Sequence, residues 1–166
     1  MFHVRIMDKD EIPFLLEMLY ESIHIPENKP PLNELLASEG LKKYSQHWGR
    51  PGDEALVAVD RNNILLGAIW YRLFSSEEPG YGFVNEATPE IGMAVTKEAR
   101  GKGLGSLLMK EAIRLAQEQG YSALSLSVDP ENVHAVMLYK KYGFTEVGLS
   151  GTSITMKCTF PVKDKF

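Results

Sequence analysis

The sequence predicts an α/β fold in which one twisted, mixed β-sheet carries helices on both of its faces. Three patterns indicate this fold. From 89 to 120, an apolar run, a Gly-rich turn and an amphipathic run follow one another, which is typical of a strand that leads into a helix. An alternating strand at 121–128 comes next, and a right-handed crossover places it parallel to the first strand. Predicted hairpins at 54–74 and 144–160 add antiparallel strands.

The N-terminal part of the chain supplies a strand and two helical segments. An alternating pattern predicts a strand at 3–7. Asp8 or Asp10 can cap the helix that follows. The apolar stripe of this helix consists of Ile12, Leu15, Leu16 and Leu19. The segment 32–48 also has a helical pattern, but Gly40 interrupts it.

The loop at 75–90, between the first hairpin and the central strand, is rich in Pro, Gly and Glu. Such a loop can rim a functional site, or it can be a solvated acidic turn. The residues favour neither interpretation over the other.

Length and composition are those of a globular protein. The chain of 166 residues is long enough for a substantial core, and we expect a single domain over residues 1–166. Apolar residues make up 44% and charged residues 24%, and no apolar run approaches the roughly 20 residues of a membrane-spanning helix. The N-terminus lacks a basic region followed by an apolar stretch. We therefore expect no signal peptide, no membrane partner and a cytoplasmic location.

Charge, cysteine and histidine content narrow the function classes. The net charge is −4 and the basic residues are dispersed, which argues against a nucleic-acid-binding surface and favours a cationic substrate. The single cysteine, Cys158, cannot form an internal disulfide, and its alternating context indicates a half-buried thiol rather than a nucleophile. Since His24, His47 and His134 lack the spacing of metal ligands, we expect no metal site.

The Gly-rich turn before the central helix has the features of a phosphate-binding site. Main-chain N–H groups at a helix N-terminus are free to bind an anion, and the helix dipole adds positive charge there. Gly101, Gly103 and Gly105 remove side chains that would block a phosphate. Arg100 and Lys102 add full positive charges. The turn is therefore predicted to bind a pyrophosphate.

Spacing excludes two of the three phosphate-binding motifs that this turn suggests. A Walker loop needs a Lys-Ser or Lys-Thr pair after its glycines, and none stands there. A dinucleotide fingerprint, Gly-x-Gly-x-x-Gly, would place its third glycine at Ser106 or Leu108. Residues 100–105, Arg-Gly-Lys-Gly-Leu-Gly, instead fit the pattern Gln/Arg-x-x-Gly-x-Gly/Ala. This pattern resembles the acetyl-coenzyme A signature of the GNAT superfamily of N-acetyltransferases.

A second block downstream strengthens the resemblance. In the second GNAT block an asparagine begins a helix that carries a tyrosine seven residues later. The same spacing is found here in Asn132, Ala135, Leu138, Tyr139, Gly143 and Phe144. Both blocks occur in the family's order, so the resemblance covers most of residues 54–160. Residues 1–50 match only in outline, and family members diverge in this region to suit their acceptors.

The resemblance implies that acetyl-coenzyme A is the acyl donor. In the family the two parallel strands splay apart and the pantetheine arm pairs with the main chain exposed between them, and a bulge near Gly92 would widen this gap. Asn132 can cap its helix as well as contact the cofactor. The residues that the resemblance assigns to coenzyme A are Met93, Ala94, Val95, Arg100, Gly101, Lys102, Gly103, Leu104, Gly105, Ser106 and Asn132.

The resemblance also implies the catalytic candidates. Tyr139 becomes the candidate proton donor to the sulfur of coenzyme A, although its residue type alone favours a core aromatic. Glu90 is the candidate base, acting through water, and strand alternation puts it on the face opposite Met93 unless the bulge intervenes. A main-chain N–H near Met93 is the expected oxyanion partner. Some family members use a glutamate on the later strand, where this chain has Ser125 and Ser127.

The sequence thus predicts an N-acetyltransferase that moves the acetyl group of acetyl-coenzyme A to a primary amine of a small-molecule or peptide acceptor, by direct attack in a ternary complex. The alternative is a coenzyme A-binding regulatory module without turnover. The acceptor is not specified, although the acidity of residues 77–90 favours a cationic amine. We expect no nucleic-acid partner, and the terminal hairpin can expose an edge for a homodimer.

Overall fold

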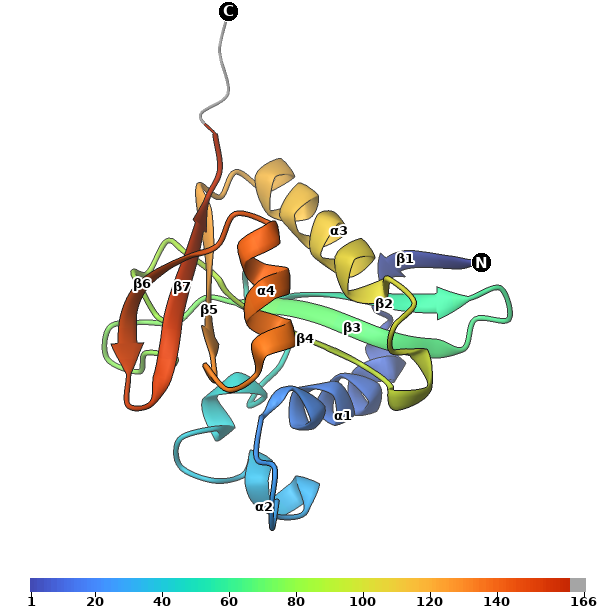
Figure 1. The fold of residues 1–166 in the computed structure, drawn as a ribbon, viewed down its shortest axis with the longest axis horizontal. Coiled ribbons are helices and arrows are strands. Elements are labelled where there is room, and N and C mark those ends of the chain that lie inside the picture. The colour runs from blue at the N-terminus through green and yellow to red at the C-terminus, as the bar shows by residue number, and fades with distance from the viewer. Residues whose placement is uncertain (162–166) are drawn as a thin grey trace, which may run out of the picture. The chain divides into compact units, whose positions relative to one another are not determined.

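The computed structural model of the protein describes residues 1–161. Its strands form one mixed sheet, as the sequence predicts (Figure 1). The order of the strands is β1-β2-β3-β4-β5-β7-β6. No helix within residues 1–161 combines the length and the apolar character needed to cross a bilayer. The strands are β1 (Phe2–Ile6), β2 (Glu54–Asp60), β3 (Leu65–Arg72), β4 (Glu90–Val95), β5 (Ala123–Val128), β6 (Thr145–Ser150) and β7 (Ser153–Thr159). The helices are α1 (Ile12–Ser22), α2 (Leu32–Leu36), α3 (Leu104–Glu118) and α4 (Val133–Lys141).

The described residues group into two compact units. The first unit comprises Met1–Arg72 and Gly92–Ala112, and the second comprises Leu73–Ile91 and the residues from Ile113 onward. A single domain over residues 1–166 therefore stays a prediction, and its C-terminal residues 162–166 lie outside the described part.

The first unit is built on an antiparallel arrangement of β1, β2 and β3. β1 pairs with β2, beginning with Phe2 opposite Asp60, and β2 pairs with β3 across the turn at 61–63. In this turn Asn63 has a φ of 62°, a left-handed conformation that asparagine tolerates. The predicted strand at 3–7 and the first predicted hairpin are confirmed.

Helices α1 and α3 cover opposite faces of β3 within this unit. Side chains of α1 are buried in one cluster with Ala68 and Trp70 of β3. Gly67 faces the other way, because successive residues of a strand alternate between its faces, and a Cβ built there would lie 3.3 Å from Leu108 of α3. The α1 residues buried in the cluster are Leu15, Met18 and Leu19, two of which belong to the predicted stripe.

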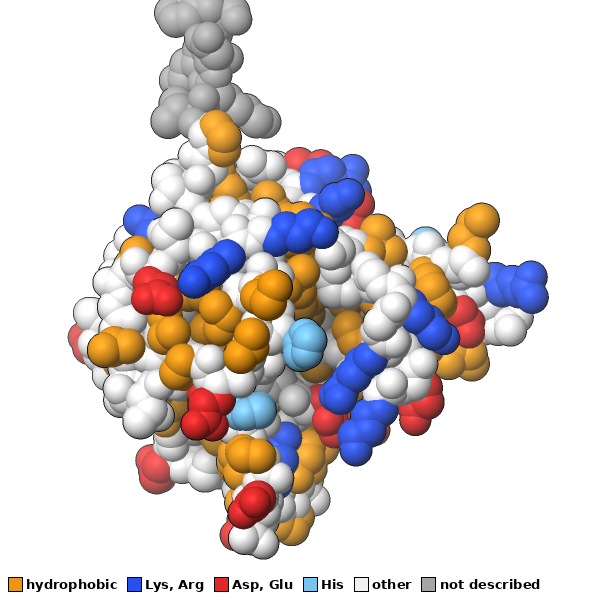
Figure 2. Space-filling view, in the orientation of Figure 1, with side chains coloured by type: hydrophobic (Ala, Val, Ile, Leu, Met, Phe, Trp, Pro, Cys, Tyr) orange, Lys and Arg blue, Asp and Glu red, His pale blue; other side chains and the backbone are white. Residues whose placement is uncertain are grey.

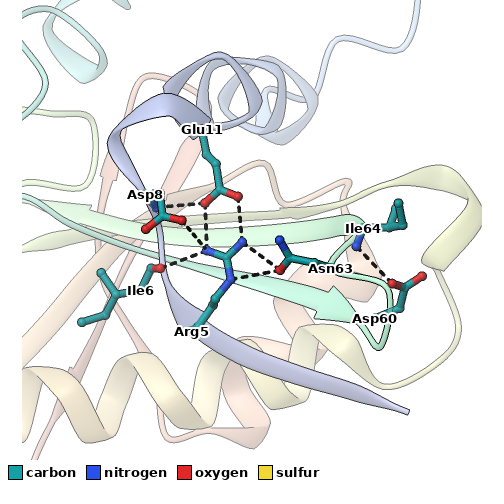
Figure 3. A network of polar contacts seen from close by, with 7 residues as sticks. All are labelled: Arg5, Ile6, Asp8, Glu11, Asp60, Asn63 and Ile64. Carbon is teal, nitrogen blue, oxygen red and sulfur yellow. Dashed lines mark hydrogen bonds and ion pairs between the residues drawn. The ribbon is translucent and has the colours of Figure 1, made fainter.

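A polar network joins β1 to the turn before α1 and to the hairpin (Figure 3). Arg5 donates to both carboxylate oxygens of Glu11, at 2.8 and 2.7 Å, and also to Oδ1 of Asn63 at 3.1 Å. The Asp8 N–H donates to Glu11 Oε1 at 2.9 Å, and Asp8 is the N-cap of the 3₁₀ turn that leads into α1. The hydrogen bonds from Arg5 lower the pKa of Glu11.

The predicted interrupted helix is largely not helical. Only Leu32–Leu36 form a helix, and Lys42–Tyr44 add a 3₁₀ turn. The Arg72 guanidinium donates to the main-chain carbonyls of Lys43 and Gln46, each at 2.8 Å. These carbonyls are thus engaged by a distant side chain, which a local helical pattern does not reveal.

The second unit contains β5, α4 and the hairpin of β6 and β7. β5 pairs antiparallel with β7, beginning with Ala123 opposite Thr159, and β6 pairs antiparallel with β7. The predicted terminal hairpin is confirmed. Cys158 of β7 is buried, its thiol donates to the Tyr142 carbonyl at 3.4 Å, and burial raises the pKa of the thiol. A buried thiol of raised pKa is a poor nucleophile, as expected.

The core of the second unit lies around β5 and β7, whereas α4 and β6 are largely exposed. No residue of α4 is buried, and residues 145–149 of β6 are all exposed. Figure 2 shows hydrophobic side chains at the surface, among acidic and basic ones. In the second unit the large exposed apolar side chains are Tyr81, Val133, Met137, Val147 and Leu149.

Candidate active site

The Gly-rich turn leads directly into α3, as predicted. Gly101 and Gly103 have φ values of 78° and 81°, which residues with a Cβ rarely adopt. A Cβ built on either glycine would meet no described atom within 4 Å, so the space beside the turn is open. Gly105 and Ser106 lie in the first turn of α3. The helix N-terminus is therefore accessible to an anion.

Charged side chains flank this opening. Arg100 and Lys102 are both exposed. Arg100 also lies 3.9 Å from the carboxylate of Glu21 in α1, which offsets part of its charge. Leu104 is only 2% exposed, so its side chain belongs to the core. The positive charge at the turn thus comes from two long, exposed side chains.

Strand β4 alternates regularly between its two edges. The Ser125 N–H of β5 donates to the Pro89 carbonyl at 3.0 Å, and the Thr96 N–H donates to the Leu66 carbonyl of β3 at 2.8 Å. Successive residues of a strand direct their main-chain groups to opposite edges. In a regular strand, the odd-numbered residue 89 and the even-numbered residue 96 face opposite edges, as they do here. A single bulge between them would turn both to the same edge, so the bulge expected near Gly92 is not found.

This alternation separates the three residues predicted to pair with pantetheine. Met93 and Val95 direct their main-chain groups to the same edge as Pro89. Ala94 directs its own toward β3, where its carbonyl oxygen would lie 3.1 Å from a Cβ built on Gly67. The prediction of main-chain pairing for Ala94 is therefore corrected, because β3 occupies that edge.

Glu90 is a buried carboxylate at the start of β4. It is 6% exposed, and its Oε1 accepts the Gly82 N–H at 3.0 Å. Gly82 packs directly on β5, since a Cβ built there would lie 2.4 Å from the carbonyl carbon of Leu126. The loop before β4 is therefore packed at this point rather than a solvated turn. Because the expected bulge is not found, the alternation leaves the Glu90 side chain on the face opposite Met93.

Ser125 lies directly opposite Glu90 in the parallel register of β4 and β5. It is fully buried, and its hydroxyl finds no hydrogen-bond partner within residues 1–161. Leaving a buried polar group unpaired destabilises a protein by about 1–3 kcal/mol. The sequence pointed to Ser125 and Ser127 together, as the residues of the later strand where some family members use a glutamate. The unpaired hydroxyl of Ser125 could be found only from the structure.

Helix α4 carries the two residues of the second block. Asn132 is the N-cap, and its Oδ1 accepts the Ala135 N–H at 3.4 Å, which confirms the capping role. Tyr139 is half-buried, with its ring edge-on to the buried Phe144 at a centroid distance of 5.9 Å. Burial raises the pKa of Tyr139 to about 12. These contacts are compatible with a core aromatic and with a proton donor.

The predicted site residues divide between the two units. The first unit holds all the cofactor candidates from Met93 to Ser106. The second unit holds Asn132 and both catalytic candidates, Glu90 and Tyr139. The structure differs from the predictions at Ala94, whose main chain faces β3, and at Gly92, where the expected bulge is not found.

Comparison with known proteins identifies the family. A model of the acetyltransferase (GNAT) family matches residues 16–144. A mycothiol acetyltransferase from Arthrobacter sp. (strain FB24) is 34% identical over 126 residues, which is 74% of this chain and 35% of that protein. The chain thus spans about a third of the length of this relative.

Solved structures share the fold. A ribosomal-protein-alanine N-acetyltransferase from Brucella melitensis matches with a TM-score of 0.68 and 22% identity, over 95% of this chain and 99% of that one. A spermidine N-acetyltransferase from Vibrio cholerae, in complex with CoA and spermine, matches with a TM-score of 0.66 and 20% identity over 95% of both chains. These structures show the shared fold, whereas the family model covers most of the chain and leads to the conclusion that the chain belongs to the acetyltransferase (GNAT) family.

Proposed function

We propose that this protein transfers the acetyl group of acetyl-coenzyme A to a primary amine of a small-molecule or peptide acceptor, by direct attack in a ternary complex. One observation carries the proposal: an open Gly-rich turn, with Gly101 and Gly103 in left-handed conformations, leads into the N-terminus of α3 in a chain of the GNAT family. Such a helix terminus binds phosphate through main-chain N–H groups.

The cofactor site that we propose runs from β4 to α3. The pyrophosphate is bound by main-chain N–H groups at 101–105, by the charges of Arg100 and Lys102, and by the hydroxyl of Ser106. The pantetheine amides pair with the main-chain groups that Met93 and Val95 direct to the same edge of β4 as Pro89. In support, the parallel register of β4 and β5 consists of one residue pair at the start of β4. Asn132 caps α4 through its carbonyl, and its NH₂ group remains a donor for the cofactor.

The reaction forms a C–N bond and breaks a C–S bond, and the amine must lose a proton. The Met93 N–H, on the same edge of β4 as the Pro89 carbonyl, is the proposed donor to the developing oxyanion. Tyr139 keeps its proton at neutral pH, because its pKa is about 12. It is therefore able to donate a hydrogen bond to the sulfur as the thiolate leaves. Since a thiol has a pKa of about 8.5, the phenol must regain its proton after Tyr139 protonates the sulfur. A protonated amine loses one proton to Glu90 through water before it attacks, and the nitrogen loses a second proton once the C–N bond has formed. The second proton restores the phenol.

Glu90 is the proposed base, acting through a water molecule. Its carboxylate is buried and Oε1 accepts the Gly82 N–H. The two oxygens of an ionised carboxylate together offer about four acceptor sites, so Glu90 can accept a water proton in addition to this bond. The unpaired hydroxyl of Ser125, opposite Glu90 in the register, supports a buried water at this place. A water bound there would give the hydroxyl its missing partner.

The proposal is tested by measuring free coenzyme A released from acetyl-coenzyme A in the presence of different amines. The panel includes spermidine and the amine precursor of mycothiol, which the names of the relatives suggest, together with an aminoglycoside, an amino acid and a peptide with a free N-terminus. Thiol release that depends on an amine supports the transferase. Coenzyme A binding without turnover on any amine would instead support the regulatory module.

Two further predictions concern the environment of the protein. A cytoplasmic location remains a prediction from the sequence. We also propose that the protein forms a homodimer through its terminal hairpin, because β6 is the last strand of the sheet and its residues 145–149 are exposed. Light scattering at several concentrations would measure the oligomeric state, and a monomer at high concentration would contradict this proposal.

A further inference from the structure

Arg72 carries a buried positive charge at the end of β3. Its side chain is 2% exposed and that of its partner, Asp53, is 1% exposed. The guanidinium donates to both oxygens of Asp53, from Nε at 2.9 Å and from Nη2 at 2.8 Å. It also lies over the ring of Trp48, with Cζ 5.0 Å from the ring centroid. A planar guanidinium held in this way fixes the geometry of every group that it contacts.

The same ion pair holds the segment between α2 and β2. Nη1 of Arg72 donates to the main-chain carbonyls of Lys43 and Gln46. Oδ2 of Asp53 accepts the main-chain N–H groups of residues 49–50, at 2.9 and 2.8 Å. Regular structure in this segment is limited to one 3₁₀ turn. Besides a few main-chain turn bonds, such as that from the Asp53 N–H to the Arg50 carbonyl, these two side chains hold residues 43–53 in place.

Side chains of the 43–53 segment pack toward the cofactor strand. Trp48 packs against the buried cluster that includes Trp70 of β3, and Ala94 of β4 packs against the same cluster. Trp70 also contacts β4 directly, since a Cβ built on Gly92 would lie 2.8 Å from the indole ring. The 43–53 segment therefore packs into the same cluster as β4, the strand beside which we propose that the thioester lies.

We infer that Arg72 is a positioning residue for the acceptor, which fixes the 43–53 segment as a wall of the acceptor site. The inference rests on the proposed acetyltransferase function. The contacts of Arg72 and Asp53 involve the 43–53 segment and not the Gly-rich turn. Loss of the pair therefore weakens the use of the acceptor and leaves coenzyme A binding intact.

The test is the double variant Arg72→Met/Asp53→Asn. Removing both charges leaves no unpaired ion in the core, and asparagine can still accept the N–H groups of residues 49–50. With the best amine found, we expect the KM for the acceptor to rise about tenfold or more, while the KM for acetyl-coenzyme A stays within about twofold. Arg72→Lys keeps the charge without the planar fork, so the acceptor KM should rise less.

The control is Arg5→Met/Glu11→Gln, which removes the other bidentate pair of this unit (Figure 3). It should leave both KM values unchanged. A second readout, the rate of cleavage by trypsin, needs no turnover. Trypsin cleaves after Lys43, whose carbonyl Arg72 binds. The Arg72/Asp53 double variant should therefore be cut there about tenfold faster than the parent, whereas the control should be cut at the parent's rate.

Any of four results would overturn the inference. Unchanged cleavage after Lys43 would show that the ion pair does not hold the segment. Faster cleavage with an unchanged acceptor KM, or with an equal rise in both KM values, would show that the segment does not position the acceptor. A parent protein without amine-dependent turnover would overturn the proposed function, and with it the acceptor role of Arg72, whatever the cleavage rate.

Discussion

The Gly-rich turn before α3 and the surroundings of Glu90 are built in opposite ways. The turn is exposed, its proposed ligand groups are mostly main-chain N–H groups, and the space beside Gly101 and Gly103 is open. Glu90 is buried under a packed loop and accepts a hydrogen bond from Gly82, and Ser125 opposite it has an unpaired hydroxyl. One region is ready to receive a charged group from solvent, whereas the other encloses polar groups in the core.

This difference predicts how the two regions respond to substitution. A side chain added to the open turn changes ligand binding with little effect on packing, because it meets no described atom. A change at a buried polar group alters stability together with chemistry, because an unpaired donor or acceptor remains. Variants of the two regions should therefore separate binding, turnover and stability.

The largest effect is expected for Gly103→Glu at the turn. The carboxylate would enter the space proposed for the pyrophosphate, so affinity for coenzyme A should fall by several kcal/mol, estimated as about 10³-fold or more. Calorimetric titration measures the affinity. The matched control is Gly120→Glu at the other end of α3, where φ is 89° and the space is equally open. Equal losses of affinity in both variants would indicate backbone strain instead of a blocked phosphate site at the Gly-rich turn.

The next largest effect is expected for Tyr139→Phe in the second unit. The ring and its edge contact with Phe144 remain, so stability should change little, whereas the leaving thiolate loses its donor. Removal of a general acid typically lowers the rate by about 10²- to 10⁴-fold. Coenzyme A affinity should survive. Turnover, affinity and melting temperature are measured on the same protein, and unchanged turnover would leave Tyr139 as a core aromatic.

Glu90→Gln should lower turnover by about 10²-fold, the lower end for a general base, because water intervenes. The amide oxygen of glutamine can still accept the Gly82 N–H, so the fold is retained. The loss should be greatest at low pH, where the amine is protonated, and smaller as rising pH supplies the neutral amine. A pH profile of kcat/KM measures this. A loss of the same size at every pH would argue for a structural role.

The two regions of this comparison show what the sequence could and could not predict. The turn at Gly101 and Gly103 was predicted correctly, because a turn is a local feature that is set by the conformations that glycine alone adopts freely. The strands of the sheet were also predicted from their periodicity, and the parallel pairing of β4 with β5 was predicted from crossover handedness. The contacts of Glu90 and Ser125 were not, since they depend on a loop that returns over β5.

The same reason explains the errors outside this comparison. The 32–48 segment has a helical pattern, but the carbonyls of Lys43 and Gln46 are bound by Arg72, far along the chain. The orientation of Ala94 depends on which edge of β4 meets β3. An arginine in the apolar run of β3 was the one local sign of a buried ion pair, since buried charges are rare without a partner.

A smaller effect is expected in the pH dependence of stability. Tyr139 has an ordinary pKa of about 10 when unfolded and a pKa of about 12 in the folded protein. Its contribution to stability is therefore complete below pH 10 and is lost as the pH rises toward 12, because the unfolded chain then ionises first. Denaturant unfolding at pH 8 to 11 should show a steeper loss in the parent than in Tyr139→Phe. Parallel curves would contradict burial of the hydroxyl.

The smallest effect is expected for Ser125→Ala, and it tests the buried side of the comparison most directly. If the hydroxyl is simply unpaired, its removal should raise the free energy of unfolding by about 1 kcal/mol and leave turnover unchanged. If it shares a water with Glu90, stability should change little, while turnover falls a few-fold and the pH dependence moves toward that of Glu90→Gln. Unfolding and pH–rate curves of the single variants and of the double variant decide between these outcomes, because two residues that hold one water are not additive. Additive losses would show that Ser125 and Glu90 act separately. Proton transfer from the amine to Glu90 would then not involve a water held by Ser125.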